Sequence, residues 1–311
     1  MTATDIPPVA SGASGGPELP ASGAAPERAE RSPMSLAMSR FWGNWGARVS
    51  VVVLALIVLA AVFGPMFLSY GPNDQDLLNS RAAPSRDHLL GTDLLGRDML
   101  ARVLDGGRVS LAVGFATALS ALVFGTIVGI AAGRLGGVVD AVLMRITDIF
   151  MAIPSMLVVI VMGGVLGPSV PLLVFLLAAF AWPSSARIAR SVVLSVRELD
   201  YVRAAEASGT RPATIMVRHL LPSVIPQVTV AGAMLVSGAI LSEAALSYLG
   251  LGVVPPQASW GNLLQQAQSY TVLSSMPWLW LSPGVAIMLT SLSIIFIGDG
   301  LRDALDPKAT R

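Results

Sequence analysis

Long uncharged runs, separated by short charged segments, follow one another from residue 49 onward. Val49–Leu68 contains 20 uncharged residues, and the run Val109–Gly133 also contains no charge. A run of about 20 apolar residues is long enough, at about 1.5 Å per residue, to cross a hydrocarbon core of roughly 30 Å. These runs therefore predict membrane-spanning helices.

The run Ile149–Ala186 is too long for one span, with 38 uncharged residues. Its interruptions are Gly163, Gly164, Gly167, Pro168 and Pro171. Length and helix breakers together predict two spans joined by a tight turn. With further spans over Leu220–Ser242, continuing to about Tyr248, and over Pro277–Gly298, the chain is expected to be an all-α integral membrane protein with six transmembrane helices.

Residues 1–40 differ from the rest, because they are rich in Pro, Ala, Gly and Ser and have no apolar periodicity. Such a composition predicts a disordered tail. We expect residues 41–108 to hold the first span and an external loop, and residues 109–311 to form a core of five spans. A cleaved signal peptide is disfavoured, because the first apolar run begins 48 residues into the chain.

Composition agrees with the membrane prediction, since 54% of residues are hydrophobic, 13% are charged and mean hydropathy is +0.70. The net charge of +1 gives no reason to expect a nucleic-acid partner, and the absence of Cys excludes a disulfide framework. The chain also lacks the P-loop, H-E-x-x-H and G-x-S-x-G patterns. We therefore expect no catalytic residues and no bound cofactor.

An even number of spans places both termini on one side, and basic residues indicate which side. Of the 20 Lys and Arg residues, 15 fall on the side of the termini and 5 lie between Tyr70 and Arg108. The positive-inside rule then makes the side of the termini cytoplasmic.

Small residues recur every four positions in the second span, at Thr117, Ala121, Gly125, Gly129 and Gly133. This spacing leaves one helix face nearly bare of side chains. Such a face lets a second helix approach closely in a membrane. The stripe predicts helix packing rather than a ligand groove.

The predicted cytoplasmic loop 199–222 reads as two short helices with a fixed elbow. Gly209 can adopt the left-handed conformation that ends a helix, and Pro212 can occupy the first turn of the next. Ala204 and Ala205 form a small apolar surface surrounded by arginines, which suits the groove of a partner protein. On composition alone, a solvated basic loop that serves only topology remains an equal alternative.

The order of residues in this loop resembles the EAA motif of ABC importer permeases. Its positions are matched by Ala204, Ala205, Gly209, Leu221 and Pro222. The usual Glu of the first position is Arg203 here, and the acidic group is Glu206, three residues later. The resemblance implies a coupling helix that docks on an ATPase subunit. An Arg-to-Glu contact at this spacing would contribute only about 0.2–0.5 kcal/mol to a helix.

Three further segments look like the dipeptide and oligopeptide importer permeases of the DppC/OppC type. They are His88–Leu111, which contains GTDLLGRD, Glu243–Leu263, and Pro277–Lys308. The resemblance implies a type I permease bundle in the inner membrane, a second permease subunit, and two ATPase subunits that use ATP and Mg. It also implies an external solute-binding protein that carries most of the specificity. A nickel chelate or another small solute is an alternative cargo.

The external segment contains two expected turn units, Gly91-Thr92-Asp93 and Gly96-Arg97-Asp98. Their Asp side chains can accept bonds from nearby backbone N–H groups, and Arg97 can pair with either Asp. A metal site made of Asp87, His88 and the two turn aspartates is disfavoured, because Arg97 and Arg102 compete for the carboxylates. We therefore expect no metal.

Glu243 is an acid in the outer half of a span, which makes it a candidate for function. Its position near the helix end favours a hydrogen-bonded role, whereas an ion-coupled secondary transporter would use it as the working acid. Such a carrier should show coupling residues or broken helices near the midplane, and usually an inverted internal repeat, and the sequence indicates neither. Arg145 and Asp148, at i, i+3 spacing, are expected to neutralise each other.

Overall fold

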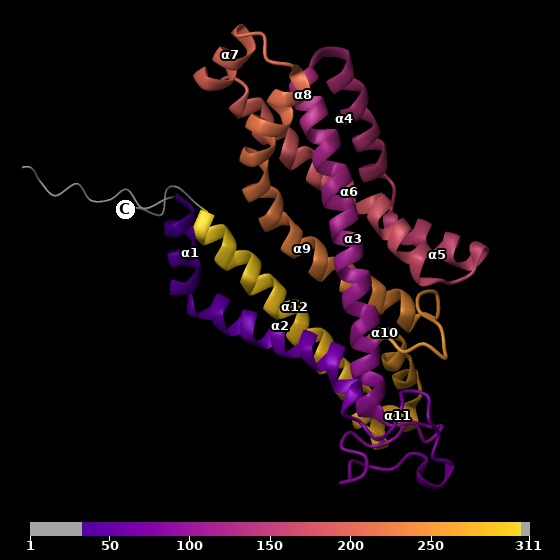
Figure 1. Ribbon diagram of the computed structural model, residues 1–311. Coiled ribbons are helices and arrows are strands. Elements are labelled where there is room, and N and C mark those ends of the chain that lie inside the picture. The colour runs from indigo at the N-terminus through magenta and orange to yellow at the C-terminus, as the bar shows by residue number, and fades with distance from the viewer. Residues whose placement is uncertain (1–32, 306–311) are drawn as a thin grey trace, which may run out of the picture.

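Helices form every regular element of the computed structural model, which describes residues 33–305 (Figure 1). The chain begins with α1 (Pro33–Gly43) and α2 (Trp45–Phe63). Asn44 separates these two helices and caps α2, because its Oδ1 accepts a hydrogen bond of 3.2 Å from the N–H of Ala47. The predicted disordered tail extended to residue 40, but residues 33–40 are helical, and residues 1–32 lie outside the described part of the chain.

A long segment, predicted to be external, follows α2 and contains two short 3₁₀ turns, η1 (Gly64–Met66) and η2 (Leu77–Asn79). It leads into α3 (Met99–Leu135), which has 37 residues. At about 1.5 Å per residue this helix is roughly 55 Å long, far more than the thickness of the hydrocarbon core. It is the central helix of the bundle (Figure 1).

The third span is broken. It consists of α4 (Gly137–Ala152) and α5 (Ser155–Leu166), which are bent by 75° at Ile153 and Pro154. Pro154 contributes to the break because proline disfavours helical backbone at the residue before it. A turn of three residues then leads into α6 (Val170–Val196).

The predicted cytoplasmic loop contains α7 (Asp200–Ala207) and α8 (Pro212–Ile215), followed by the π-helical turn η3 (Met216–Leu220) and α9 (Leu221–Tyr248). At the opposite end of the bundle lie α10 (Trp260–Leu264), η4 (Gln265–Gln268) and α11 (Tyr270–Ser275). The last helix, α12 (Trp278–Leu305), runs beside α2 and also contacts α1 and α9 (Figure 1).

The all-α membrane architecture is confirmed. Among residues 33–305, five helices are long and apolar enough to span a membrane, and α4 with α5 makes a sixth span when the bent pair is counted as one. The sequence placed the third span after residue 149, but it begins at Gly137. Similarly, α6 continues past Ala186 and carries Arg187 and Arg190 inside the helix. Both errors have one cause. The predicted spans were limited to uncharged residues, whereas α4 and α6 contain charged residues that neutralise each other in pairs.

The stripe of small residues on α3 faces α6 from Ala121 to Gly133, and α6 is the helix with which α3 makes its most extensive contact. Thr117, the first residue of the stripe, instead lines a cavity. A Cβ atom placed on Gly125 would lie 2.5 Å from the carbonyl oxygen of Trp182. A Cβ on Gly129 would lie 2.7 Å from the Cβ of Ala189, and one on Gly133 2.8 Å from Cγ1 of Val193. The backbones of α3 and α6 therefore approach each other so closely that a residue with a Cβ would not fit at these positions. Ala121, at the same face, is buried.

Candidate functional site

The elbow between α7 and α8 is formed by backbone hydrogen bonds at the end of α7. The N–H of Gly209 donates to the carbonyl of Glu206 at 2.9 Å, and the N–H of Thr210 donates to the carbonyl of Ala205 at 3.1 Å. This pair of bonds is the Schellman motif, which requires a left-handed residue after the helix. Gly209 has φ +76°, and Pro212 opens α8 at its first turn. The predicted elbow is confirmed.

One face of α7 is buried and the other is free. Val202 is fully buried and packs in a cluster with Ile215 and Leu220, which anchors the helix to the bundle. Ala204 and Tyr201 are exposed on the other side. The short helix is therefore anchored at Val202 and exposes a small surface that includes Ala204.

Charged side chains connect α7 to its surroundings in pairs that the sequence did not indicate. Nη2 of Arg134, in the last turn of α3, lies 3.0 Å from Oε1 of Glu206. Arg203 does not pair with Glu206; its guanidinium bonds to Glu198, and this hydrogen bond lowers the pKa of the Glu198 carboxyl below its usual value. The displaced acid of the loop thus links α7 to the central helix of the bundle.

The other end of the loop enters α9 through η3. The N–H of Leu221 donates to the carbonyl of Met216, an i to i−5 bond that defines the π turn. Pro222 follows in the first turn of α9 and provides no N–H for a regular bond to the helix before it. Leu220 is fully buried, while Leu221 is half-buried and Pro222 exposed. Short π segments of this kind occur often at functional sites.

Two ion pairs clamp α4 against α6 on the same side of the bundle. The guanidinium of Arg190 forms two bonds to Asp140, at 2.5 and 2.6 Å, and Arg187 lies 2.5 Å from Asp148. The prediction that Asp148 pairs with Arg145 is wrong. Asp148 faces α6, because the break at Pro154 lets α4 run back along that helix.

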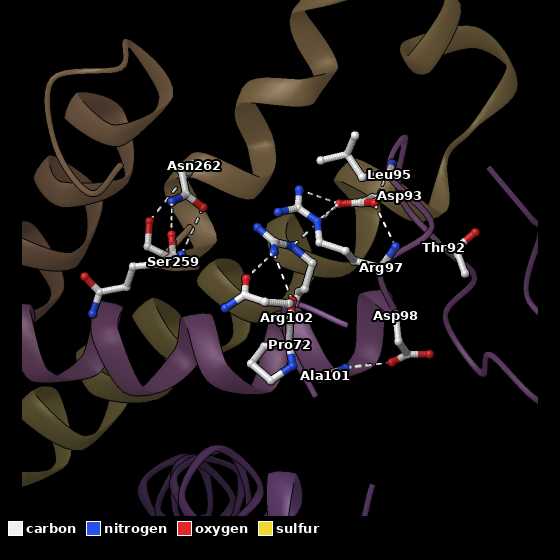
Figure 2. A network of polar contacts seen from close by, with 12 residues as sticks. Pro72, Thr92, Asp93, Leu95, Arg97, Asp98, Ala101, Arg102, Ser259 and Asn262 are labelled. Carbon is white, nitrogen blue, oxygen red and sulfur yellow. Dashed lines mark hydrogen bonds and ion pairs between the residues drawn. The ribbon is translucent and has the colours of Figure 1, made fainter. Parts of the chain in front are cut away.

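At the opposite end, Asp93 is the centre of the external network shown in Figure 2. Its Oδ1 accepts hydrogen bonds from the N–H groups of Leu95 and Arg97, at 2.8 and 3.0 Å. Its Oδ2 lies 2.7 Å from Nε of Arg97 and 3.7 Å from Nε of Arg102. Arg102 also donates to the carbonyl of Pro72 at 3.0 Å, so the network fixes the loop to the first turn of α3.

The remaining signature residues complete this attachment. Oδ1 of Asp98 caps α3 by accepting from the N–H of Ala101 at 2.8 Å, and its Oδ2 lies 2.9 Å from Nδ1 of His88. Thr92 accepts a bond from the N–H of Ala82. Gly91 and Gly96 both have positive φ, and a Cβ on Gly96 would collide with the backbone of Asp76. No three acidic or histidine side chains of the described residues form a metal-ligand group.

Glu243 is fully buried and holds three segments together. It accepts hydrogen bonds from Ser110 of α3 at 2.8 Å and from Ser247 of α9 at 2.7 Å. Ser110 in turn accepts from the N–H of Trp260, and Ser247 accepts from the N–H of Val253, at 3.2 and 2.9 Å. The acid therefore fixes the segment before α10 between the two long helices.

Sequence reasoning missed the partners of this acid. Ser110 is 133 residues away from Glu243, and a lone Ser in an apolar helix gives no signal of such a contact. The capping box of α10, in which the Ser259 side chain bonds the N–H of Asn262 and the Asn262 side chain bonds the N–H of Ser259, was visible in the sequence and could have located this short helix.

Two family models match different parts of the chain. Residues 32–84 match the N-terminal transmembrane domain of oligopeptide transport permease C. Residues 125–311 match the model described as the binding-protein-dependent transport system inner membrane component. The chain belongs to this family. It is therefore a multi-pass membrane component of a binding-protein-dependent transport system, and the matched part runs from the second half of α3 through α12.

Similar proteins cover almost the whole chain. The oligopeptide transport system permease protein OppC of Bacillus subtilis (strain 168) is 39% identical over 285 residues, which are 91% of this chain and 93% of that protein. A relative from Brucella suis, assigned as a peptide permease, is 40% identical over 281 residues, which are 90% and 93% of the two chains. A Brucella abortus relative, assigned as a peptide transport system permease, is 40% identical over 278 residues, or 89% and 93%.

Proposed function

We propose that this chain is the permease subunit of an ATP-driven importer of short peptides, and that α7 transmits movement from partner ATPases to the membrane helices. The family and the relatives named as peptide permeases support the transport role and the cargo. The observation that carries the coupling role is the geometry of α7, which is anchored by Val202 and tied to α3 through Glu206 and Arg134.

A rigid connection is what this role requires. A partner that grips the exposed side of α7 moves a helix whose buried side packs on the start of α9 and whose carboxylate contacts the end of α3. Because α3 is continuous over 37 residues, displacement at one end reaches the far end of the bundle. Arg203, at the usual position of a Glu, bonds Glu198 within this chain, so its charge is already paired beside Ala204.

The remaining subunits follow from the same proposal. A second, similar permease would enclose the pathway with this chain, and two ATPase subunits would bind ATP and Mg on the cytoplasmic face. A solute-binding protein would deliver peptide at the external loop. In this arrangement the chain itself binds no cofactor, and both termini and α7 lie in the cytoplasm. The excess of Lys and Arg on that side supports the orientation.

The test compares two substitutions at Gly209 in the assembled complex. Gly209→Val places a β-branched residue at φ +76°, which strains the backbone, whereas Gly209→Asn tolerates this conformation. No atom lies within 4 Å of the added Cβ, so the effect is conformational rather than steric. We expect Gly209→Val to abolish peptide uptake while the subunit still inserts and assembles, and Gly209→Asn to transport. Full uptake by the Val variant in an assembled complex would refute the coupling role.

The bend between α4 and α5 is a broken helix of the kind expected in an ion-coupled carrier, but the geometry of Glu243 does not support that role. Its two carboxylate oxygens are occupied by hydroxyl donors from Ser110 and Ser247, and these contacts hold helices in place. The family match also places the chain among components that work with other subunits. Transport by the purified chain alone, driven by an ion gradient, would reverse this conclusion.

A further inference from the structure

A cavity of about 330 Å³ lies where α3, α5, α6 and α9 meet. Thr117 of α3, Ser155 and Met156 of α5, Phe180 of α6 and Ser242 of α9 are among the residues that line it. Thr117 is the middle residue of the 37-residue helix α3. The cavity therefore lies near the midplane of the bundle, away from α7 and from the external network.

Thr117 has a hydroxyl group that the protein leaves unsatisfied. The residue is 1% exposed, and its Oγ1 has no hydrogen-bond partner within the described residues. Burial of a hydroxyl without a partner is unfavourable. A polar atom that entered the cavity would supply the missing bond.

The first turn of α5 provides a second polar feature of the same cavity. Ser155 and Met156 are its first two residues, and Pro154 makes no side-chain capping bond. The N–H groups of Leu157 and Val158 donate to the carbonyl of Pro154, which leaves those of Ser155 and Met156 as the first-turn donors without an acceptor inside the helix. Such groups carry a partial positive charge. The break at Ile153 and Pro154 thus places the first turn of α5 at the cavity, near the midplane of the bundle. Irregular backbone at this depth is tolerated where it lines a cavity.

The rest of the lining defines the chemistry of an occupant. Among the described residues that line the cavity, none is charged, and most are apolar, as Met156, Val159 and Phe180 are. The backbone N–H groups of α5 and the hydroxyl of Thr117 are hydrogen-bond donors without a full charge. They suit a carboxylate or carbonyl oxygen that binds weakly enough to be released again. The apolar wall suits a small hydrophobic side chain next to that oxygen.

We propose that this cavity is a transit site that receives the C-terminal carboxylate of a short peptide, against the first turn of α5 and Thr117. The proposal rests on the proposed function, in which the chain passes peptides through the membrane. The carboxylate accepts hydrogen bonds from the free N–H groups and from Thr117, and the last side chain of the peptide contacts the apolar wall. No covalent step is involved.

The chain contains no Cys, so a single thiol can be introduced and followed. Ser155→Cys in the complete complex is exposed to the anionic thiosulfonate reagent MTSES, with ATP and peptide-loaded binding protein present. We expect labelling, and we expect Ala-Ala-Ala to slow it about tenfold more than Ala-Ala-Ala amide, a factor that corresponds to about 1.4 kcal/mol. The matched control is Val161→Cys, exposed on α5 but outside the cavity lining, which neither peptide should protect.

Thr117→Val provides a second readout, because it keeps the shape and removes the hydroxyl. We expect a higher KM for Ala-Ala-Ala, an unchanged kcat, little change for the amide, and recovery in Thr117→Ser. A role in packing alone would affect both peptides equally. Equal protection by the two peptides, or an inaccessible thiol at residue 155, would overturn the transit site. If the wild-type complex imports neither peptide, the proposed function fails instead.

Discussion

The carboxylate of Glu206 in α7 lies 3.0 Å from the guanidinium of Arg134 at the end of α3. This contact joins the short helix outside the bundle to the longest helix inside it. Both side chains are partly exposed, so the pair contributes only about 0.2–1 kcal/mol to stability. In the proposed coupling role, the pair transmits movement from α7 to α3.

Reversal of these two charges tests that role. Arg134→Glu and Glu206→Arg should each lower the amount of peptide imported per ATP hydrolysed by up to about fivefold, since the pair is worth at most about 1 kcal/mol. The double variant should recover most of this loss in reconstituted vesicles. Arg145→Glu, which makes the same change of charge on α4, is the control. A double variant as poor as its parents would show that the pair does not transmit movement.

The close approach of α3 and α6 predicts a strong effect of a single methyl group. Gly129→Ala should destabilise the complex by about 1–3 kcal/mol, because the added Cβ would overlap the backbone and side chain of α6. Thermal unfolding in detergent measures the effect. Gly164→Ala on α5 meets no atom within 4 Å and should leave the unfolding temperature unchanged or raise it. Equal melting of both variants would mean that α3 and α6 do not pack this closely.

The external network should depend on the charge of Asp93. Asp93→Asn leaves Arg102, which is 2% exposed, and Arg97 without their anion, and removal of one partner of a buried pair costs about 3–5 kcal/mol. Backbone amides of residues 72–98 should then exchange hydrogen faster. The control is Asp74→Asn, whose carboxylate accepts an exposed bond from the N–H of Gly71. Unchanged hydrogen exchange in the Asp93 variant would show that this network does not hold the loop in place.

Two substitutions separate a positioning role of Glu243 from proton transfer. Glu243→Gln keeps the size of the side chain and one acceptor oxygen, so uptake should remain close to that of the wild type at every pH. Glu243→Ala leaves the hydroxyls of Ser110 and Ser247 without their acceptor and should cost about 1–3 kcal/mol for each buried group. Uptake that disappears in the Gln variant while the complex stays assembled would contradict the positioning role.

Several features of this protein could be predicted from the sequence because they are local. The spans, five or, with the bent pair of α4 and α5, six among the described residues, follow from the length of the uncharged runs. The elbow follows from Gly209 and Pro212, whose backbone preferences do not depend on distant residues. The errors in the bounds of α4 and α6 arose because charged residues were assumed to lie outside the membrane-spanning helices. Arg187 and Arg190 lie inside α6 because α4 supplies Asp148 and Asp140 beside them.

The sequence by itself determined that the chain is a bundle of membrane helices. It also located the stripe of small residues on α3 and the loop that resembles a coupling helix. Hydrophobic length and glycine conformation act over one or two turns, so they can be read along the chain. Only the tertiary structure decided that Glu206 contacts Arg134, that Glu243 bonds Ser110, and that α4 and α5 meet at a bend of 75°. The two contacts join residues far apart in the sequence, 133 positions for Ser110 and Glu243, so they depend on how the helices pack.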